Sequence, residues 1–118
     1  MGAAAVKRLE LVDGAQVDWP SADTVREAVG NLSARIEFVV LRGPGGGFVQ
    51  AAWGPTAGLA PGHFLLETKG EHVDGHVQAV VTDVDQLVRA FLGFLEDDPS
   101  WAEEHAWSRW TSEGPPQP

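Results

Sequence analysis

The residues best suited to bind another molecule are gathered near the carboxyl-terminal end of the sequence. Five carboxylates and three of the five tryptophans lie between positions 96 and 110. These residues are Glu96, Asp97, Asp98, Trp101, Glu103, Glu104, Trp107 and Trp110. Tryptophan beside charge is a common anchor in protein interfaces, and carboxylates attract a basic partner. The segment therefore predicts a surface that binds a basic protein, although tryptophans can equally close a hydrophobic core.

The acidic charge is concentrated in the second half of the chain. The 118 residues have a formal net charge of −9. Residues 1–60 contain five basic and six acidic side chains, whereas residues 61–118 contain three basic and eleven acidic ones. Because nucleic-acid binding depends on phosphate neutralisation by Lys and Arg, this balance argues against a nucleic-acid partner. It would speed the docking of a basic protein, or serve only to keep the chain soluble.

No motif in the sequence indicates catalysis or metal binding. Cysteine is absent, so a thiol nucleophile and cysteine metal sites are excluded. His72 and His76 are four residues apart, but the sequence Asp74-Gly75 predicts a turn between them and no third ligand is positioned nearby. The glycine-rich stretch 43–47 lacks the Lys-Ser/Thr pair of a phosphate-binding loop and leads into a strand. We therefore expect a protein that is not an enzyme and holds no cofactor and no metal.

The spacing of apolar residues predicts an α+β domain. Strand-like patterns occupy residues 6–12, 35–42, 48–54, 63–69 and 76–81, and the glycine-rich stretch 43–47 predicts a hairpin turn. Helical patterns follow Ser21 and Asp83, and a short helix is expected after Ser100. The predicted order is β-α-β-β-β-β-α-α. It corresponds to an antiparallel sheet of about five strands with the helices packed on one face.

Capping signals define the long helix that leads to the acidic segment. Thr82 or Asp83 is expected to cap the helix, and Asp83 is followed three residues later by Gln86, which is typical of a helix start. Asp97 and Asp98 lie at its carboxyl-terminal end, where the helix dipole disfavours negative charge. We therefore expect these two acids to give the helix no local benefit and to lie in a solvated loop or an acidic patch that awaits a partner.

The short terminal helix is expected to carry the tryptophans. Ser100 and Glu103 have the spacing of a capping box. On a continuous helix Trp107 and Trp110 would lie about 60° apart, and Trp101 about 180° from Trp110. One surface could not bury all three, so at least one tryptophan is expected at a rim or exposed.

Length and composition indicate one domain without a membrane segment. Residues 1–110 are expected to form a single α+β domain and residues 111–118 a disordered tail. No apolar run approaches the roughly 20 residues of a membrane helix, and the first residues do not resemble a secretory signal. We expect a cytoplasmic protein that is a monomer or weak dimer and does not bind a membrane.

The order of several short motifs resembles a known family. The stretches IEFVVL, GGGFVQAAWG, FLLETKG and LVRAFLGFLEDDPSW, with a final W..W, are similar to the first-named family of immunity proteins of bacterial polymorphic toxin systems, often encoded beside deaminase-type toxins. The resemblance extends from about Val6 to Trp110. It implies a cytosolic α+β protein that neutralises a cognate toxin domain without catalysis. The recurring positions would here be Gly47, Phe48, Trp53, Glu67, Trp101, Trp107 and Trp110.

The resulting hypothesis is an immunity protein that binds the basic carboxyl-terminal domain of a toxin, such as a deaminase or nuclease. The acids from Glu96 to Glu104 and a neighbouring tryptophan would face a groove that normally holds nucleic acid, and Glu67 is also expected to contact the partner. An interaction or adaptor module unrelated to toxins is the alternative. A small enzyme with a site formed by Glu67, His63 and Gln50 across the sheet is a third hypothesis.

Overall fold

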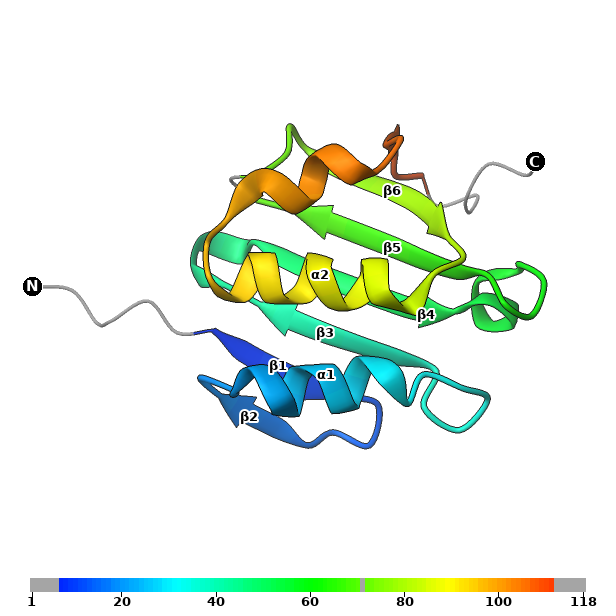
Figure 1. Ribbon diagram of the computed structural model, residues 1–118, viewed down its shortest axis with the longest axis horizontal. Coiled ribbons are helices and arrows are strands. Elements are labelled where there is room, and N and C mark those ends of the chain that lie inside the picture. Colours follow the sequence, from blue (N-terminus) through cyan, green and yellow to red (C-terminus); the bar gives the residue numbers. More distant parts are fainter. Residues whose placement is uncertain (1–6, 71, 112–118) are drawn as a thin grey trace, which may run out of the picture.

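The computed structural model describes residues 7–70 and 72–111, which form a sheet covered on one face by helices (Figure 1). The strands are β1 (Arg8–Leu11), β2 (Gln16–Asp18), β3 (Phe38–Arg42), β4 (Phe48–Trp53), β5 (Phe64–Lys69), β6 (His76–Val81) and β7 (Ser108–Arg109). The helices are α1 (Ala22–Gly30) and α2 (Val84–Leu95), with 3₁₀ turns η1 (Pro44–Gly46), η2 (Gly54–Ala57) and η3 (Pro99–Glu104). The α+β class and the placement of both α-helices on one face are confirmed.

The sheet has seven strands in the order β2-β1-β3-β4-β5-β6-β7, and every neighbouring pair is antiparallel. The prediction of about five strands was wrong because β2 has three residues and β7 two, too few to show an alternating pattern. The predicted first strand begins at β1, and Val6 lies outside the described residues. Of the predicted tail, only Thr111 lies within them.

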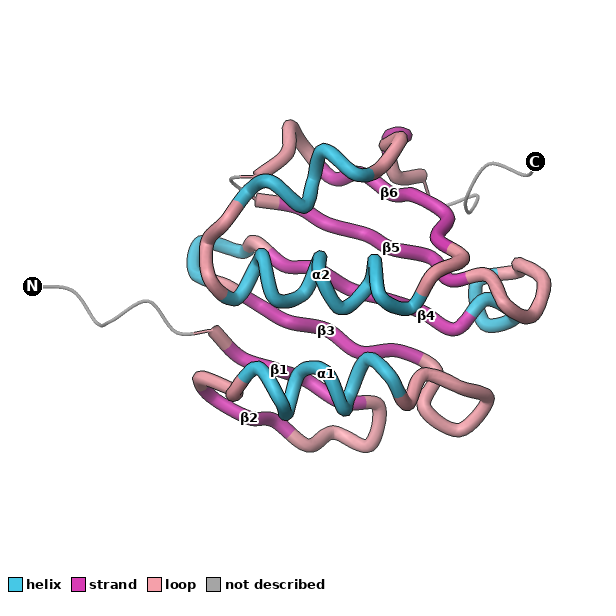
Figure 2. Tube along the Cα trace, in the orientation of Figure 1, coloured by secondary structure: helices cyan, strands magenta, loops and turns pink. Residues whose placement is uncertain are grey.

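The predicted terminal helix is replaced by η3, which ends at Glu104 (Figure 2). Asp98, and not the predicted Ser100, is its cap; Pro99 begins it, and the chain then extends into β7. The short terminal helix therefore carries Trp101 but not Trp107 or Trp110, and the 100° spacing does not describe the three tryptophans.

Alternation along the strands gives the sheet two different faces. Val39, Ala51 and Leu66 are cross-strand partners and belong to the main core, which the helices cover with Leu87 and Phe91 among others. No α-helix of the described residues lies on the other face, part of which is covered by η2 and Leu59. Its central row is the polar series Gln50, Glu67 and Gln78, aligned by the pairing of β4, β5 and β6.

The end of α2 is held by contacts that the sequence did not reveal. The amide of Asp98 donates to the carbonyl of Gly93 at 2.8 Å and that of Asp97 to Phe94 at 3.3 Å, with Asp97 at a φ of 57°. This is the left-handed helix ending that aspartate tolerates better than most residues. The buried Lys7 ammonium donates to Asp97 at 2.7 Å and to the Phe94 carbonyl at 2.7 Å. The expectation that Asp97 lacks a local role was therefore wrong.

Candidate functional site

The three terminal tryptophans lie in three different environments. Trp101 is only 3% exposed and belongs to the main core, where its indole N–H donates to Nδ1 of His72 at 2.9 Å. Its ring lies against the backbone of Gly93 in α2. Trp107 is half-buried, whereas Trp110 is 39% exposed. Trp101 is therefore a core residue whose side chain presents almost no surface to a partner.

Trp107 lies between the buried Trp101 and the protein surface. The two rings meet edge to face with centroids 5.9 Å apart, and the indole N–H of Trp107 donates to the carbonyl of Ala102 at 2.8 Å. His105 also contacts this pair, with its ring 5.2 Å from that of Trp107. These contacts fix one face of Trp107 and leave part of its ring at the surface.

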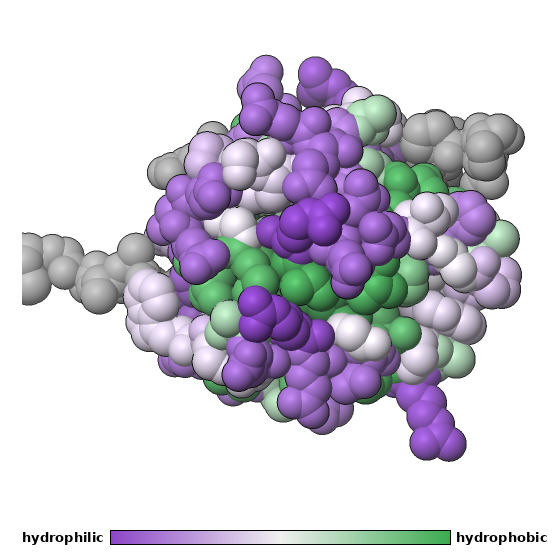
Figure 3. Space-filling model, in the orientation of Figure 1, coloured by the Kyte–Doolittle hydropathy of each residue, from purple (hydrophilic) through white to green (hydrophobic). Residues whose placement is uncertain are grey.

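A groove of about 630 Å³ opens beside Trp107, between the segment that precedes β6 and η3. Its wall is apolar, with three carboxylates at its rim. The lining residues are His72, Val73, Asp74, Val77, Asp98, Pro99, Ser100, Ala102, Glu103 and Trp107. We call it the acidic groove. On the helical side of the molecule, Figure 3 shows hydrophilic side chains over η3 and an apolar band along α2.

The rim carboxylates of the acidic groove form no salt bridge with a described Lys or Arg side chain. Asp74, Asp98 and Glu103 form no ion pair within residues 7–70 and 72–111. Asp98 accepts a hydrogen bond from the backbone amide of Ser100 at 3.0 Å, and this contact lowers the pKa of its carboxyl. All three are therefore available to a cation.

The other predicted acids are arranged differently. Glu104 forms a two-pronged contact with Arg89 at 3.0 to 3.2 Å, and Asp97 is paired with Lys7. Glu96 lies on the neighbouring surface between α2 and η3. Thus two of the five acids balance internal cations. The sequence did not identify Asp74 as a site residue, because only the fold brings it to the rim of the acidic groove. Its place in a predicted turn was the only sequence signal for an exposed position.

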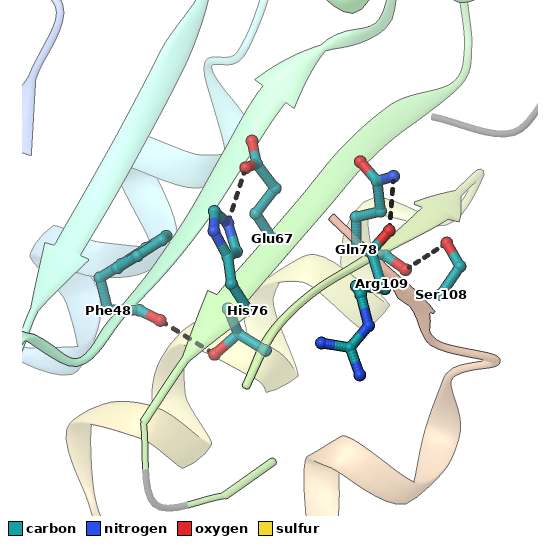
Figure 4. Close-up of polar contacts among 7 residues, drawn as sticks. Phe48, Glu67, His76, Gln78, Ser108 and Arg109 are labelled. Atoms are coloured by element: carbon teal, nitrogen blue, oxygen red, sulfur yellow. Dashed lines mark hydrogen bonds and ion pairs between the residues drawn. The ribbon is translucent and has the colours of Figure 1, made fainter. Parts of the chain in front are cut away.

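Glu67 lies on the opposite face of the sheet. Its carboxylate meets Nε2 of His76 at 3.1 Å, as Figure 4 shows. The His76 ring stacks on Trp110 with centroids 4.8 Å apart and an interplanar angle of 3°. Phe48 meets the same imidazole edge to face at 5.3 Å. Glu67 and Trp110 therefore belong to an aromatic cluster on the face opposite the two α-helices, separate from the acidic groove.

The three residues proposed for an enzyme site are not brought together. Gln50 is the cross-strand partner of Glu67. His63 precedes β5 and lies about 13 Å from Glu67 along the strand, at roughly 3.3 Å per residue. Within residues 7–70 and 72–111, no group of three or more His, Cys, Asp or Glu side chains could hold a metal ion. His72 contacts Trp101, whereas His76 contacts Glu67 on the other face.

Comparison with known proteins leaves the family resemblance as a prediction. No protein-family model, curated protein or solved structure matches the chain. Among the helices in the described segments, none combines the length and the apolar character needed to cross a bilayer.

His105 gives the Trp101–Trp107 cluster a testable pH response. Burial lowers the pKa of its imidazole below the ordinary 6.5. The unfolded chain therefore binds this proton first as the pH falls below about 6.5, and the contribution to stability that is complete above that pH is progressively lost. We expect urea denaturation to show a smaller decrease in stability between pH 7.5 and 5.5 for His105→Gln than for the wild type. Equal decreases would contradict a buried neutral imidazole.

Proposed function

We propose that this chain binds a basic protein through the acidic groove and that it acts in the cytoplasm as an immunity protein against a toxin domain. The observation that carries the binding role is the combination of three carboxylates without ion pairs to the described residues and an apolar wall that includes Trp107. The toxin is suggested by the motif resemblance alone.

The groove chemistry fits a long cationic side chain. The methylene stem of Arg or Lys can lie along Val77, Pro99 and Trp107, while its charged end reaches a rim carboxylate. Arginine can also stack on an indole ring. A toxin domain that acts on nucleic acid must display such side chains in its own binding groove. Occupation of that groove would prevent nucleic acid from entering.

Neutralisation of the groove tests this proposal directly. The variant Asp74→Asn, Asp98→Asn and Glu103→Gln removes three charges but keeps side chains of nearly the same shape. The carboxamide oxygen introduced by Asp98→Asn would still accept the hydrogen bond from the Ser100 amide that begins η3. We expect binding of the basic partner to fall by at least about tenfold, since each charged contact contributes roughly 1 kcal/mol or more.

The control variant changes the same number of charges elsewhere. The control substitutions are Asp23→Asn, Glu27→Gln and Glu37→Gln. All three positions lie within residues 1–60, and none of them lines the acidic groove. Wild type, groove variant and control would each be used to capture proteins from cells of the source organism. The captured basic domain would then be expressed alone or with each variant in a growth assay.

The expected result separates binding from protection. Wild type and control should retain the domain and restore growth, whereas the groove variant should do neither. Equal capture by the groove variant would contradict the acidic groove as the binding site. Capture of a basic domain that does not impair growth would contradict the immunity role and favour an adaptor.

A further inference from the structure

The most unusual backbone position of the fold lies far from the acidic groove. Trp19 has a φ of 51°, in the left-handed region where a bulky side chain is a rare outlier. Its amide donates to the carbonyl of Lys7 at 2.8 Å, and the buried Pro20 and the helix cap Ser21 follow it. The chain must turn here from β2 into α1, but Gly or Asn would do so at lower cost.

The side chain at this costly position faces solvent. Trp19 is 55% exposed, the largest value among the exposed large hydrophobic residues described. A residue that strains the backbone and leaves its indole in water contributes little to the fold. Such outliers persist where the side chain has a use. An exposed tryptophan is the residue type most enriched at binding hot spots.

Trp19 borders an unpaired strand edge. β2 is the terminal strand of the described sheet, so one side of it has no neighbouring strand there. Ala15 and Trp19 make their backbone hydrogen bonds toward β1, to Leu11 and Lys7. Because these directions alternate along an antiparallel strand, the amide and carbonyl groups of Gln16 and Asp18 point outward. The edge therefore offers two donors and two acceptors next to an exposed indole.

We propose that this edge pairs with the same edge of a second copy of the chain. In an antiparallel register centred on Val17, Gln16 of one copy faces Asp18 of the other, and the outward backbone groups of both residues meet in four hydrogen bonds. The Gln16 side-chain amide would face the Asp18 carboxylate, and the two Val17 side chains would face each other. A register centred on Asp18 would instead oppose two carboxylates, each of which is paired with Arg8 of its own chain.

The charge distribution favours this end of the sheet for self-association. The strands and helix nearest the edge (β1, β2, α1 and β3) come from residues 1–60, which carry five basic and six acidic side chains. Most of the net charge of −9 lies in the other half, beside β6 and β7. A pair joined through β2 would therefore keep the strongly acidic ends apart. Two-fold symmetry pairs the β2 edge of one copy with the β2 edge of the other, so the assembly closes at two copies.

Trp19 would act as the anchor of this interface. The register places it opposite Ala15 of the second copy, whose small side chain leaves room for an indole. Three paired residues and one tryptophan from each copy make a small contact, so the dimer is weak. The short edge also limits any further strand pairing.

The test is sedimentation velocity of the full chain over roughly 10 µM to 1 mM, where small interfaces associate. Trp19→Asn introduces a residue that tolerates positive φ but removes the indole, so it should weaken the dimer at least about tenfold. Gln16→Pro removes an outward amide without touching the pairing to β1, and should also weaken it. The matched control Trp110→Asn removes an exposed tryptophan at the opposite end and should leave the association unchanged.

Thermal denaturation at a concentration where the wild type is monomeric distinguishes an effect of a substitution on the interface from an effect on the stability of the monomer. Trp19→Asn should leave the melting temperature unchanged or raise it, because the backbone strain is relieved. A chain that stays monomeric at every concentration would overturn the proposal. So would a dimer that neither Trp19→Asn nor Gln16→Pro weakens, or a marked loss of monomer stability in Trp19→Asn.

Discussion

Replacement of Gly93 by alanine is expected to lower the free energy of unfolding by about 2 to 3 kcal/mol. A Cβ atom at this position would lie 2.3 Å from Cδ1 and 2.9 Å from Cγ of Trp101, and 3.0 Å from the carbonyl oxygen of Asp98. The indole is buried and cannot move aside without disturbing the core. This clash outweighs the roughly 1 kcal/mol that alanine ordinarily gains over glycine inside a helix.

Gly30 in α1 supplies the control for this substitution. A Cβ added there meets no atom within 4 Å, and Gly30 is also a helical residue. Gly30→Ala should therefore be neutral or slightly stabilising in the same urea denaturation measurement. Similar effects of the two substitutions would show that Gly93 is not required for the approach of Trp101. The double variant Gly93→Ala, Trp101→Leu should be less destabilised than the sum of its single changes, because the smaller side chain relieves the clash.

Substitution of Trp101 by alanine is expected to cost about 3 to 5 kcal/mol of unfolding free energy. The indole fills the space between α2 and η3, and its loss would leave a cavity beside Gly93. It would also remove the indole N–H that donates to Nδ1 of His72, and the edge-to-face contact with Trp107. Because Trp107 lines the acidic groove, this variant should also bind a basic partner less well.

Trp110 provides the comparison, since it is a neighbour in sequence with a different environment. Trp110→Ala removes an exposed ring stacked on His76 and should cost about 1 kcal/mol or less. Trp101→Phe should fall between the two, because it keeps a buried ring but loses the indole N–H. Chemical denaturation of the three variants measures this order. Equal costs for Trp101→Ala and Trp110→Ala would contradict the assignment of Trp101 to the core.

Local signals in the sequence predicted the two α-helices well. Ser21 and Asp83 are the observed N-caps, accepting from the amides of Thr24 and Asp85. The strands from β3 to β6 were likewise predicted because each has five or six residues of strongly strand-like composition. These elements depend on residues within one turn or strand, so the sequence alone contains the necessary information.

The candidate site depended on contacts between distant segments, which the sequence pattern does not reveal. The acidic groove combines the segment before β6 with η3, so Asp74 joins Asp98 and Glu103 only in the folded chain. Composition predicted an acidic surface but could not separate carboxylates that balance Arg89 or Lys7 from those that do not. The Glu67–His76 contact was accessible in principle, because the predicted pairing of the two strands places these residues on one face.

The buried Lys7 has a consequence for the order in which the protein can fold. Its ammonium contacts Asp97, 90 residues later in the sequence, and Trp101 completes the same end of the core. A ribosome must therefore release almost the whole domain before β1 can be secured to the end of α2. Until then the helix-facing side of the sheet lacks part of its cover. Such long-range closure favours slow folding and leaves the growing chain open to premature association.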